Sequence, residues 1–175
     1  MSEVPSGSWD SPQVENFASH VGRERHTSGE SSANGGGGGG RDAADPDPAE
    51  VHGWYTTGME LLGKGSPAAA AQVLQRAANA EPGSRSIREA LARAQFDTGQ
   101  YEAAAANFRT IVEASPADDY ANFGLGLALA RGGEHEAAAE YLALAAAMRP
   151  DRKPYTDALH QVRATLKSRK RPERP

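Results

Sequence analysis

A repeat period of 34 residues is the feature that most constrains the fold of this chain. Three residue types recur at that spacing and in the same phase. They are Gly65, Gly99 and Gly133, then Pro82, Pro116 and Pro150, then Ala70, Ala104 and Ala138. A period of this length is typical of solenoids in which each repeat is a pair of helices joined by a turn. The sequence therefore predicts an all-α chain whose repeats stack into a solenoid.

Glycine and proline mark the helix ends within each repeat. The glycines fall where the first helix of a pair should stop, because glycine adopts the left-handed cap conformation at least cost. The prolines follow the second helix, which they cannot continue. Asp47 followed by Pro48 is a helix-start signature, and the other expected N-caps are Ser66, Ser84 and Asp118. The expected helices lie near 48–63, 67–79, 85–97, 101–114, 119–131, 135–147 and 153–168.

Small residues in the middle of the helices indicate close crossings. Gly58, Ala92 and Gly126 fall inside the first helix of each pair. We expect them to face the repeating alanines of the second helices, since only small side chains let two helices approach so closely. Larger apolar residues should fill the space on either side; they include Leu61, Leu74, Leu91, Phe108, Leu125, Leu129 and Leu142.

The composition changes sharply near residue 47. Residues 1–50 hold nine acids and three arginines, a net charge of −6, whereas the whole chain carries −4 and the remainder therefore about +2. A stretch so rich in Ser, Gly, Pro and acids buries too little apolar surface to offset its ordering entropy. The expected organisation is a disordered acidic Gly/Ser-rich tail at 1–46, repeats at about 51–84, 85–118 and 119–152, a capping helix at about 153–168 and a basic tail at 169–175.

One patch of the N-terminal tail contains apolar side chains. Trp9, Val14 and Phe17 lie within nine residues, and the run Gly35 to Gly40 separates them from the repeats. They are either scattered residues of a tail or a short segment that folds on a partner. The glycine run is interpreted as a linker rather than a phosphate-binding loop, because no strand precedes it and no Lys-Ser/Thr follows.

Residues at fixed positions of the repeats resemble the tetratricopeptide repeat family over residues 50–150. The matching residues are Trp54, Gly58, Ala70, Ala77 and Pro82 in the first repeat, Leu91, Tyr101, Ala104, Phe108 and Pro116 in the second, and Leu125, Gly126, Ala138, Ala145 and Pro150 in the third. Thr57, Ile111 and His135 depart from the family pattern. The resemblance implies a right-handed superhelix of three helix pairs and a cap, whose first helices line a concave groove that commonly holds peptides.

Helical phase places one stripe of residues on the groove side of the first helices. The candidate partner-binding residues are His52, Tyr55, Met59, Leu62, Glu89, Arg93, Phe96, Tyr120, Phe123, Leu127 and Arg131. Aromatic residues, Met and Arg are the types enriched at binding hot spots. The alternative is that some of these rings pack against the neighbouring repeat.

The family also includes chaperone adaptors that hold a C-terminal carboxylate with Lys, Asn and Arg side chains. The matching positions here hold Tyr55, Met59, Ala90, Tyr120 and Gly124. None of these side chains can form that clamp, so this activity is not expected.

No set of residues indicates catalysis, a cofactor or a metal. The chain has no cysteine, which excludes disulfides and thiolate sites. The run Gly58 to Lys64 imitates a phosphate-binding loop, but Gly65 stands where the Mg²⁺-binding Ser or Thr should be. His135, at a position where the family packs an aromatic ring, is interpreted as structural. The sequence therefore predicts a protein that is not an enzyme.

The predicted function is a protein- or peptide-binding adaptor or scaffold that uses the concave face. The alternative is a structural subunit of a homo-oligomer, or a fixed regulatory partner of an enzyme, with that face covered; the oligomeric state is left open. Nucleic acid is not expected as the partner, since the groove is not basic as in an RNA-reading pentatricopeptide repeat, although the basic C-terminal tail keeps it as an alternative. With no apolar run near the roughly 20 residues that cross a bilayer and no signal-peptide pattern, we expect a cytoplasmic protein without a membrane partner.

Overall fold

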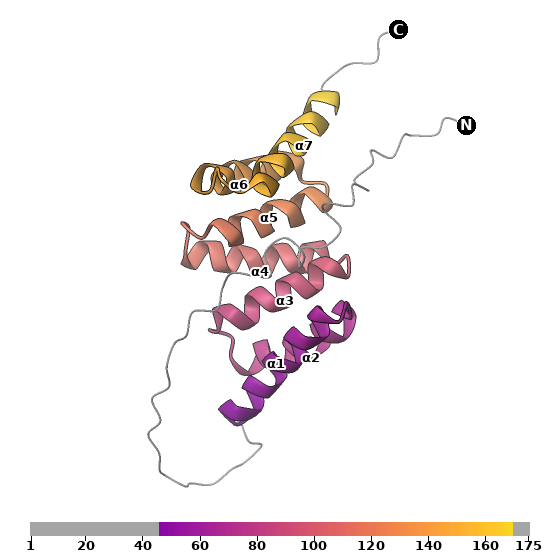
Figure 1. Ribbon diagram of the computed structural model, residues 1–175, viewed down its shortest axis with the longest axis vertical. Helices are drawn as coiled ribbons and strands as arrows, with labels where there is room; N and C mark the ends of the chain where they lie inside the picture. The colour runs from indigo at the N-terminus through magenta and orange to yellow at the C-terminus, as the bar shows by residue number, and fades with distance from the viewer. Residues whose placement is uncertain (1–45, 170–175) are drawn as a thin grey trace, which may run out of the picture.

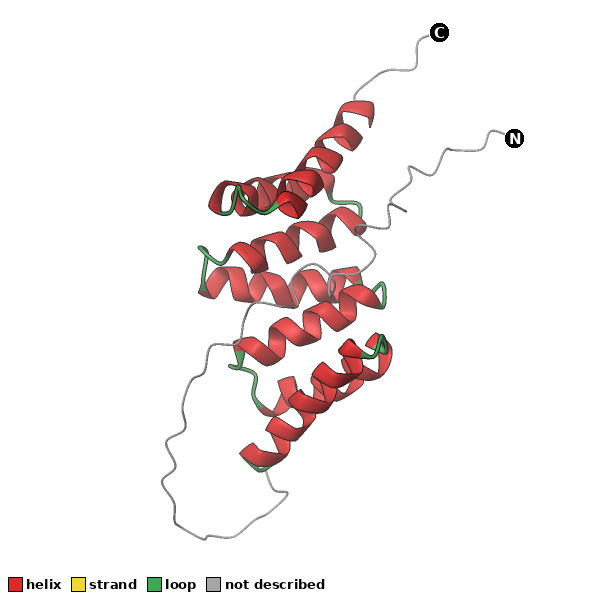
Figure 2. Ribbon diagram, viewed as in Figure 1, coloured by secondary structure: helices red, strands yellow, loops and turns green. Residues whose placement is uncertain are grey.

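The computed structural model describes residues 46–169, and residues 1–45 and 170–175 lie outside the description. The described part is built from helices without a strand (Figure 2). The helices are α1 (Pro48–Gly63), α2 (Pro67–Ala80), α3 (Arg85–Asp97), α4 (Tyr101–Ala114), α5 (Asp119–Arg131), α6 (His135–Met148) and α7 (Lys153–Arg169). The predicted all-α fold is confirmed, and each predicted helix end falls within one residue of the observed end. The expected disorder of residues 1–46 stays a prediction, because residues 1–45 lie outside the described range.

The helices form a single stack in chain order, from α1 at one end to α7 at the other (Figure 1). Short connections make neighbouring helices antiparallel, so the odd-numbered helices run in the same direction. The helix α3 contacts both α1 and α5, and α5 also contacts α7. Among α2, α4 and α6, by contrast, no Cα atom of one helix lies within 8 Å of a Cα atom of another. The stack therefore curves toward the odd-numbered helices. We call their side turned away from α2, α4 and α6 the concave face.

Each turn within a helix pair has a glycine in the left-handed region. The φ angles are 71° at Gly65, 78° at Gly99 and 90° at Gly133. Around Gly65, the amide of Ser66 donates to the carbonyl of Leu61 at 2.9 Å, and the two later turns repeat this bond. This is the Schellman arrangement, which satisfies carbonyl groups at the end of a helix. The structure confirms the predicted role of the glycine period.

The four expected N-caps divide into two groups. Asp47 Oδ1 accepts from the amide of Ala49 at 3.2 Å, and Asp118 Oδ1 accepts from the amide of Ala121 at 3.0 Å. Ser66 and Ser84 occupy N-cap positions, but their hydroxyls form no capping hydrogen bond. Helix starts at α1 and α5 are therefore stabilised by an acidic side chain, which also complements the helix dipole.

The helix crossings are closest at glycines, as expected, but the residues facing them are leucines. An ideal Cβ added to Gly58 would lie 2.4 Å from Leu74 Cγ, and one added to Gly126 would lie 2.6 Å from Leu142 Cγ. The alanines proposed as their partners lie about one turn earlier on the second helices and are completely buried. The glycines therefore make room for the leucine side chains of the paired helix.

A third close approach joins two consecutive repeats. An ideal Cβ on Gly124 would lie 2.6 Å from two atoms of the Phe108 ring. Phe108 is completely buried and also meets Tyr120 edge to face, with ring centroids 6.4 Å apart. The α4–α5 contact therefore depends on a large ring fitting against a residue without a side chain.

Tyr155 joins the last helix to α5. Tyr155 is 1% exposed and stacks on Phe123, with centroids 4.3 Å apart and planes inclined by 21°. Its hydroxyl donates to Asp119 Oδ2 at 2.9 Å. The helix α7 therefore covers the end of the last repeat, as the prediction of a capping helix requires.

Replacing Tyr155 with phenylalanine should remove this hydrogen bond and keep the stacking. We expect the free energy of unfolding to fall by about 1–2 kcal/mol, because the acceptor is a carboxylate. Chemical denaturation followed by circular dichroism measures the change. Tyr141→Phe is the matched control, since the half-buried Tyr141 has no described hydrogen bond through its hydroxyl, and it should change stability by less than about 0.5 kcal/mol. Equal losses in the two variants would contradict the role of the Tyr155–Asp119 bond.

Candidate binding face

The predicted groove stripe divides by exposure along the stack. His52 on α1 is exposed, whereas Tyr55, Met59, Glu89, Arg93 and Arg131 are half-buried. The remaining five are buried, and they are Leu62, Phe96, Tyr120, Phe123 and Leu127. The partly accessible members of the stripe therefore lie mainly on α1 and α3.

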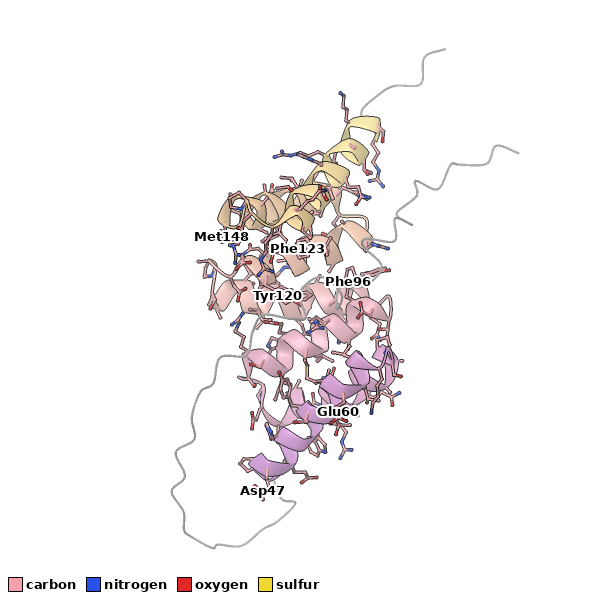
Figure 3. The ribbon with its side chains drawn as sticks, in the orientation of Figure 1. Asp47, Glu60, Phe96, Tyr120, Phe123 and Met148 are labelled. Atoms are coloured by element: carbon pink, nitrogen blue, oxygen red, sulfur yellow. The ribbon has the colours of Figure 1, made fainter. Side chains whose placement is uncertain are left out.

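The helix α5 explains why so many stripe residues are buried. Every residue from Tyr120 to Ala130 is buried, because α5 packs against α4 and α6 and also contacts α3 and α7. Figure 3 labels Tyr120 and Phe123 of α5, with Asp47 at the α1 end of the stack and Met148 on α6, beside α7. The α5 part of the stripe serves the core at least as much as the surface.

The aromatic residues of the stripe pack against rings of neighbouring helices. Phe96 meets Tyr101 edge to face at 5.4 Å, and Phe123 stacks on Tyr155. The alternative raised from the sequence, that rings of the stripe pack against the neighbouring repeat, therefore describes Tyr120, which meets Phe108, while Phe123 is covered by the capping helix. The assignment of the whole stripe to partner binding stays a prediction.

Arg93 is the centre of a charged cluster on α3. Its Nε is shielded from solvent, and no described residue accepts a hydrogen bond from it. Burial raises the pKa of Asp97, and the nearby positive charge of Arg93 partly opposes that rise. Burial likewise raises the pKa of Tyr120 on α5, again opposed by Arg93, whereas Glu89 and Asp97 contribute to the rise. Arg93 therefore acts electrostatically on side chains of both α3 and α5.

A second arginine ties the start of α3 to the start of α5. Arg85 forms ion pairs with Glu89, at 3.4 Å, and with Asp118. Because the Asp118 carboxylate also caps α5, the same group serves as a cap and as an ion-pair partner. The predicted site residue Glu89 is thus held by a cation that the sequence reasoning did not single out.

The sequence reasoning also missed a polar network between α3 and α4. Asn107 donates to Gln95 Oε1 at 2.8 Å and accepts from Arg88 at 3.1 Å. Gln95 is 6% exposed, so its amide needs this partner. A signal was available, because the first repeat has Trp54 and Leu61 at the positions 34 residues before Arg88 and Gln95. The network is a polar substitute for apolar packing in the second repeat.

The histidine and the apparent phosphate-binding loop that the sequence raised lie at positions consistent with a structural role. His135 is 4% exposed and its Nδ1 lies 2.7 Å from the carbonyl oxygen of Gly133. Gly58, the start of the apparent phosphate-binding loop, lies inside α1. Among residues 46–169, no three His, Asp or Glu side chains gather as metal ligands would. Within the same range, no helix combines the length and the apolar character needed to cross a membrane.

Comparison with solved structures places the fold among tetratricopeptide domains. The Sgt2 TPR domain from Aspergillus fumigatus superposes with a TM-score of 0.65 at 19% identity, covering 78% of this chain and 91% of that chain. The first TPR of Spaghetti (RPAP3), bound to the HSP90 peptide SRMEEVD, gives a TM-score of 0.63 at 17% identity over 69% of this chain and 95% of that chain. The MamA chain from Desulfovibrio magneticus RS-1 gives a TM-score of 0.56 at 20% identity over 69% of this chain and 78% of that chain. At these identities the likeness shows a shared fold.

Comparison with protein families gives the assignment. No curated protein sequence matches the chain. The tetratricopeptide repeat model matches residues 55–119 and 89–153, which together span more than half of the chain. These matched ranges contain the glycine turns, the closely packed glycines and the terminal prolines described above. The chain therefore belongs to the tetratricopeptide repeat family.

Proposed function

We propose that the chain is an adaptor or scaffold that binds another protein, or a peptide from it, on the concave face. The observation that supports this most directly is the shielded Nε of Arg93, which has no hydrogen-bond partner among the described residues. Arg93 as a whole is only half-buried, and its guanidinium forms no ion pair with a described residue, so a ligand carboxylate could pair with it. The half-buried Tyr55 and Met59 on the adjacent α1 supply apolar contact area beside it.

The family and two neighbours support a peptide ligand. Two RPAP3 domains with this fold are bound to chaperone peptides, one to a peptide from HSP90 and one to a peptide from HSP70. The carboxylate-clamp positions here offer no cation, and three of them, Ala90, Tyr120 and Gly124, are buried. We therefore propose a ligand held by apolar contacts and by Arg93, in the cytoplasm, rather than one held by its C-terminal carboxylate.

The test compares one concave-face variant with one matched control. Full-length wild type, Tyr55→Ala with Arg93→Gln, and Tyr141→Ala with Arg109→Gln serve as baits for affinity capture with mass spectrometry. The control pair changes the same residue types, at similar burial for the tyrosines, on α6 and α4. A true partner should be lost with the first variant and kept with the second.

The captured partner is then divided into synthetic overlapping peptides and titrated by fluorescence anisotropy. The concave-face variant should weaken binding of the active peptide by tenfold or more, which corresponds to about 1.4 kcal/mol, as expected when hot-spot residues are truncated. Equal binding by both variants would show that the concave face is not the binding face. A stable oligomer on size exclusion, with that face inaccessible to peptide, would favour the structural-subunit alternative.

A further inference from the structure

We infer that the concave face has a ligand within its own chain, the segment Trp9 to Phe17. The inference rests on the proposed function, because it concerns the same face. This segment lies outside the described residues, and the inference is supported by its sequence, its attachment point and the described surface.

The chemistry of the segment matches the concave face. Its apolar side chains are Trp9, Val14 and Phe17, and the carboxylates of Asp10 and Glu15 lie between them. The face offers half-buried Tyr55 and Met59 for apolar contact. Aromatic residues carry a large share of binding energy in such contacts.

Arg93 supplies the matching polar group. It has no ion pair and no hydrogen bond with another described residue, although Glu89 and Asp97 lie on the same helix. Glu89 is paired with Arg85, and Asp97 acts on Arg93 electrostatically without forming an ion pair with it. A carboxylate from Asp10 or Glu15 would give the guanidinium the charged acceptor that its own helix does not provide.

The attachment point places the segment within reach. The chain enters the solenoid at Asp47, the N-cap of α1, and α1 is one of the helices that line the concave face. About 30 residues separate Phe17 from Asp47, and a Gly/Ser-rich chain of that length typically spans about 30 Å. The axes of α1 and α5 are two helix-packing steps apart, each of about 8–10 Å. The segment can therefore reach α3 and α5 without stretching.

Tethering makes even a weak contact significant. A flexible linker of this length gives an effective concentration near the millimolar scale, so an intrinsic dissociation constant of about 1 mM would fill about half of the faces. At half occupancy, an external ligand would bind about twofold more weakly than to an empty face. The segment would thus act as a weak built-in competitor.

Spin labelling tests the inference on the full-length chain. Because the chain has no cysteine, Ser11→Cys carries a single nitroxide without further changes. We expect amide signals near Met59 and Arg93 to lose about half of their intensity or more, as half occupancy requires. Signals of Arg109 on α4 and Glu140 on α6 should keep theirs. A mixture of spin-labelled and isotope-labelled chains separates contacts within one chain from contacts between chains.

Ser31→Cys is the matched control in the same tail. Residue 31 is closer to Asp47 along the chain than residue 11 is. In a tail without a preferred site, a label at residue 31 would therefore broaden the amide signals of the concave face more than a label at residue 11. The inference predicts the opposite order. It also predicts that Trp9→Ala with Phe17→Ala removes the effect of the residue 11 label.

Each outcome is decisive. Stronger broadening from residue 31, broadening centred on α4 and α6, or no response to Trp9→Ala with Phe17→Ala would overturn the inference and leave the proposed function standing. Concave-face broadening that depends on Trp9 and Phe17 supports it. If that broadening is present while the captured partner binds Tyr55→Ala with Arg93→Gln as tightly as the wild type, the proposed function fails and the inference stands.

Discussion

Replacing Gly126 with leucine is expected to lower the free energy of unfolding by about 3 kcal/mol, the upper end of the usual cost of overpacking. The first added carbon would already lie 2.6 Å from Leu142 Cγ and 3.2 Å from the backbone nitrogen of Leu142. Because one of these atoms belongs to the backbone, α5 and α6 must separate. The gain in helix propensity, about 0.8 kcal/mol, offsets only part of this cost. Urea denaturation followed by far-ultraviolet circular dichroism measures the difference.

Gly53→Leu is the matched control for this variant. Gly53 also lies inside a helix, but a Cβ there meets nothing within 4 Å. Without a clash the propensity term stands alone, so this variant should gain about 0.5–1 kcal/mol. A double variant, Gly126→Leu with Leu142→Ala, should lose less than the sum of the two single losses, because the residues are in contact. Additive losses, or an unchanged stability of Gly126→Leu, would contradict this close crossing of α5 and α6.

Phe108→Ala is the second large effect, with an expected loss of about 3–5 kcal/mol. The ring is completely buried where α4 meets α5, and it contacts Gly124 and Tyr120. Gly124 has no side chain that could fill the cavity left by the missing ring. The cavity should therefore persist instead of collapsing. Calorimetric melting or urea denaturation gives the size of the loss.

Leu144→Ala, on α6 of the third helix pair, is the control variant for Phe108→Ala. Leu144 is 52% exposed, so its truncation should change stability by no more than about 0.5 kcal/mol. A loss in Phe108→Ala as small as that of Leu144→Ala would mean that the second and third repeats are not joined through this ring.

The local order of the chain follows from the sequence alone. The glycine and proline period marks the end of each helix from α1 to α6, because a left-handed cap and a ring without an amide hydrogen act through the backbone of one or two residues. Gly65, Gly99 and Gly133 all have positive φ, and each predicted helix end lies within one residue of the observed end. The resemblance to the tetratricopeptide family is carried by the same positions.

The sequence also narrows the candidate site, through helical phase. It separates Tyr55 and Met59, half-buried on α1, from residues that face the second helix of the pair. It cannot show that Phe123 is covered by Tyr155, since the two are 32 positions apart and their contact requires α5 and α7 to meet. Helical phase is a property of one helix, whereas the burial of a side chain depends on which residues the neighbouring helices place over it.

Tertiary structure decided the partners of the small and polar residues. Gly126 makes room for Leu142, whose Cγ would lie 2.6 Å from an added Cβ, whereas the sequence alone paired this glycine with Ala138. Arg85 engages Glu89 and Asp118, whereas the Nε of Arg93 has no hydrogen-bond partner among the described residues. Turns and helix lengths depend on each residue and its neighbours in the chain, and the sequence determines them. Side-chain pairing depends on the rotation and spacing of whole helices, which only the packed stack establishes.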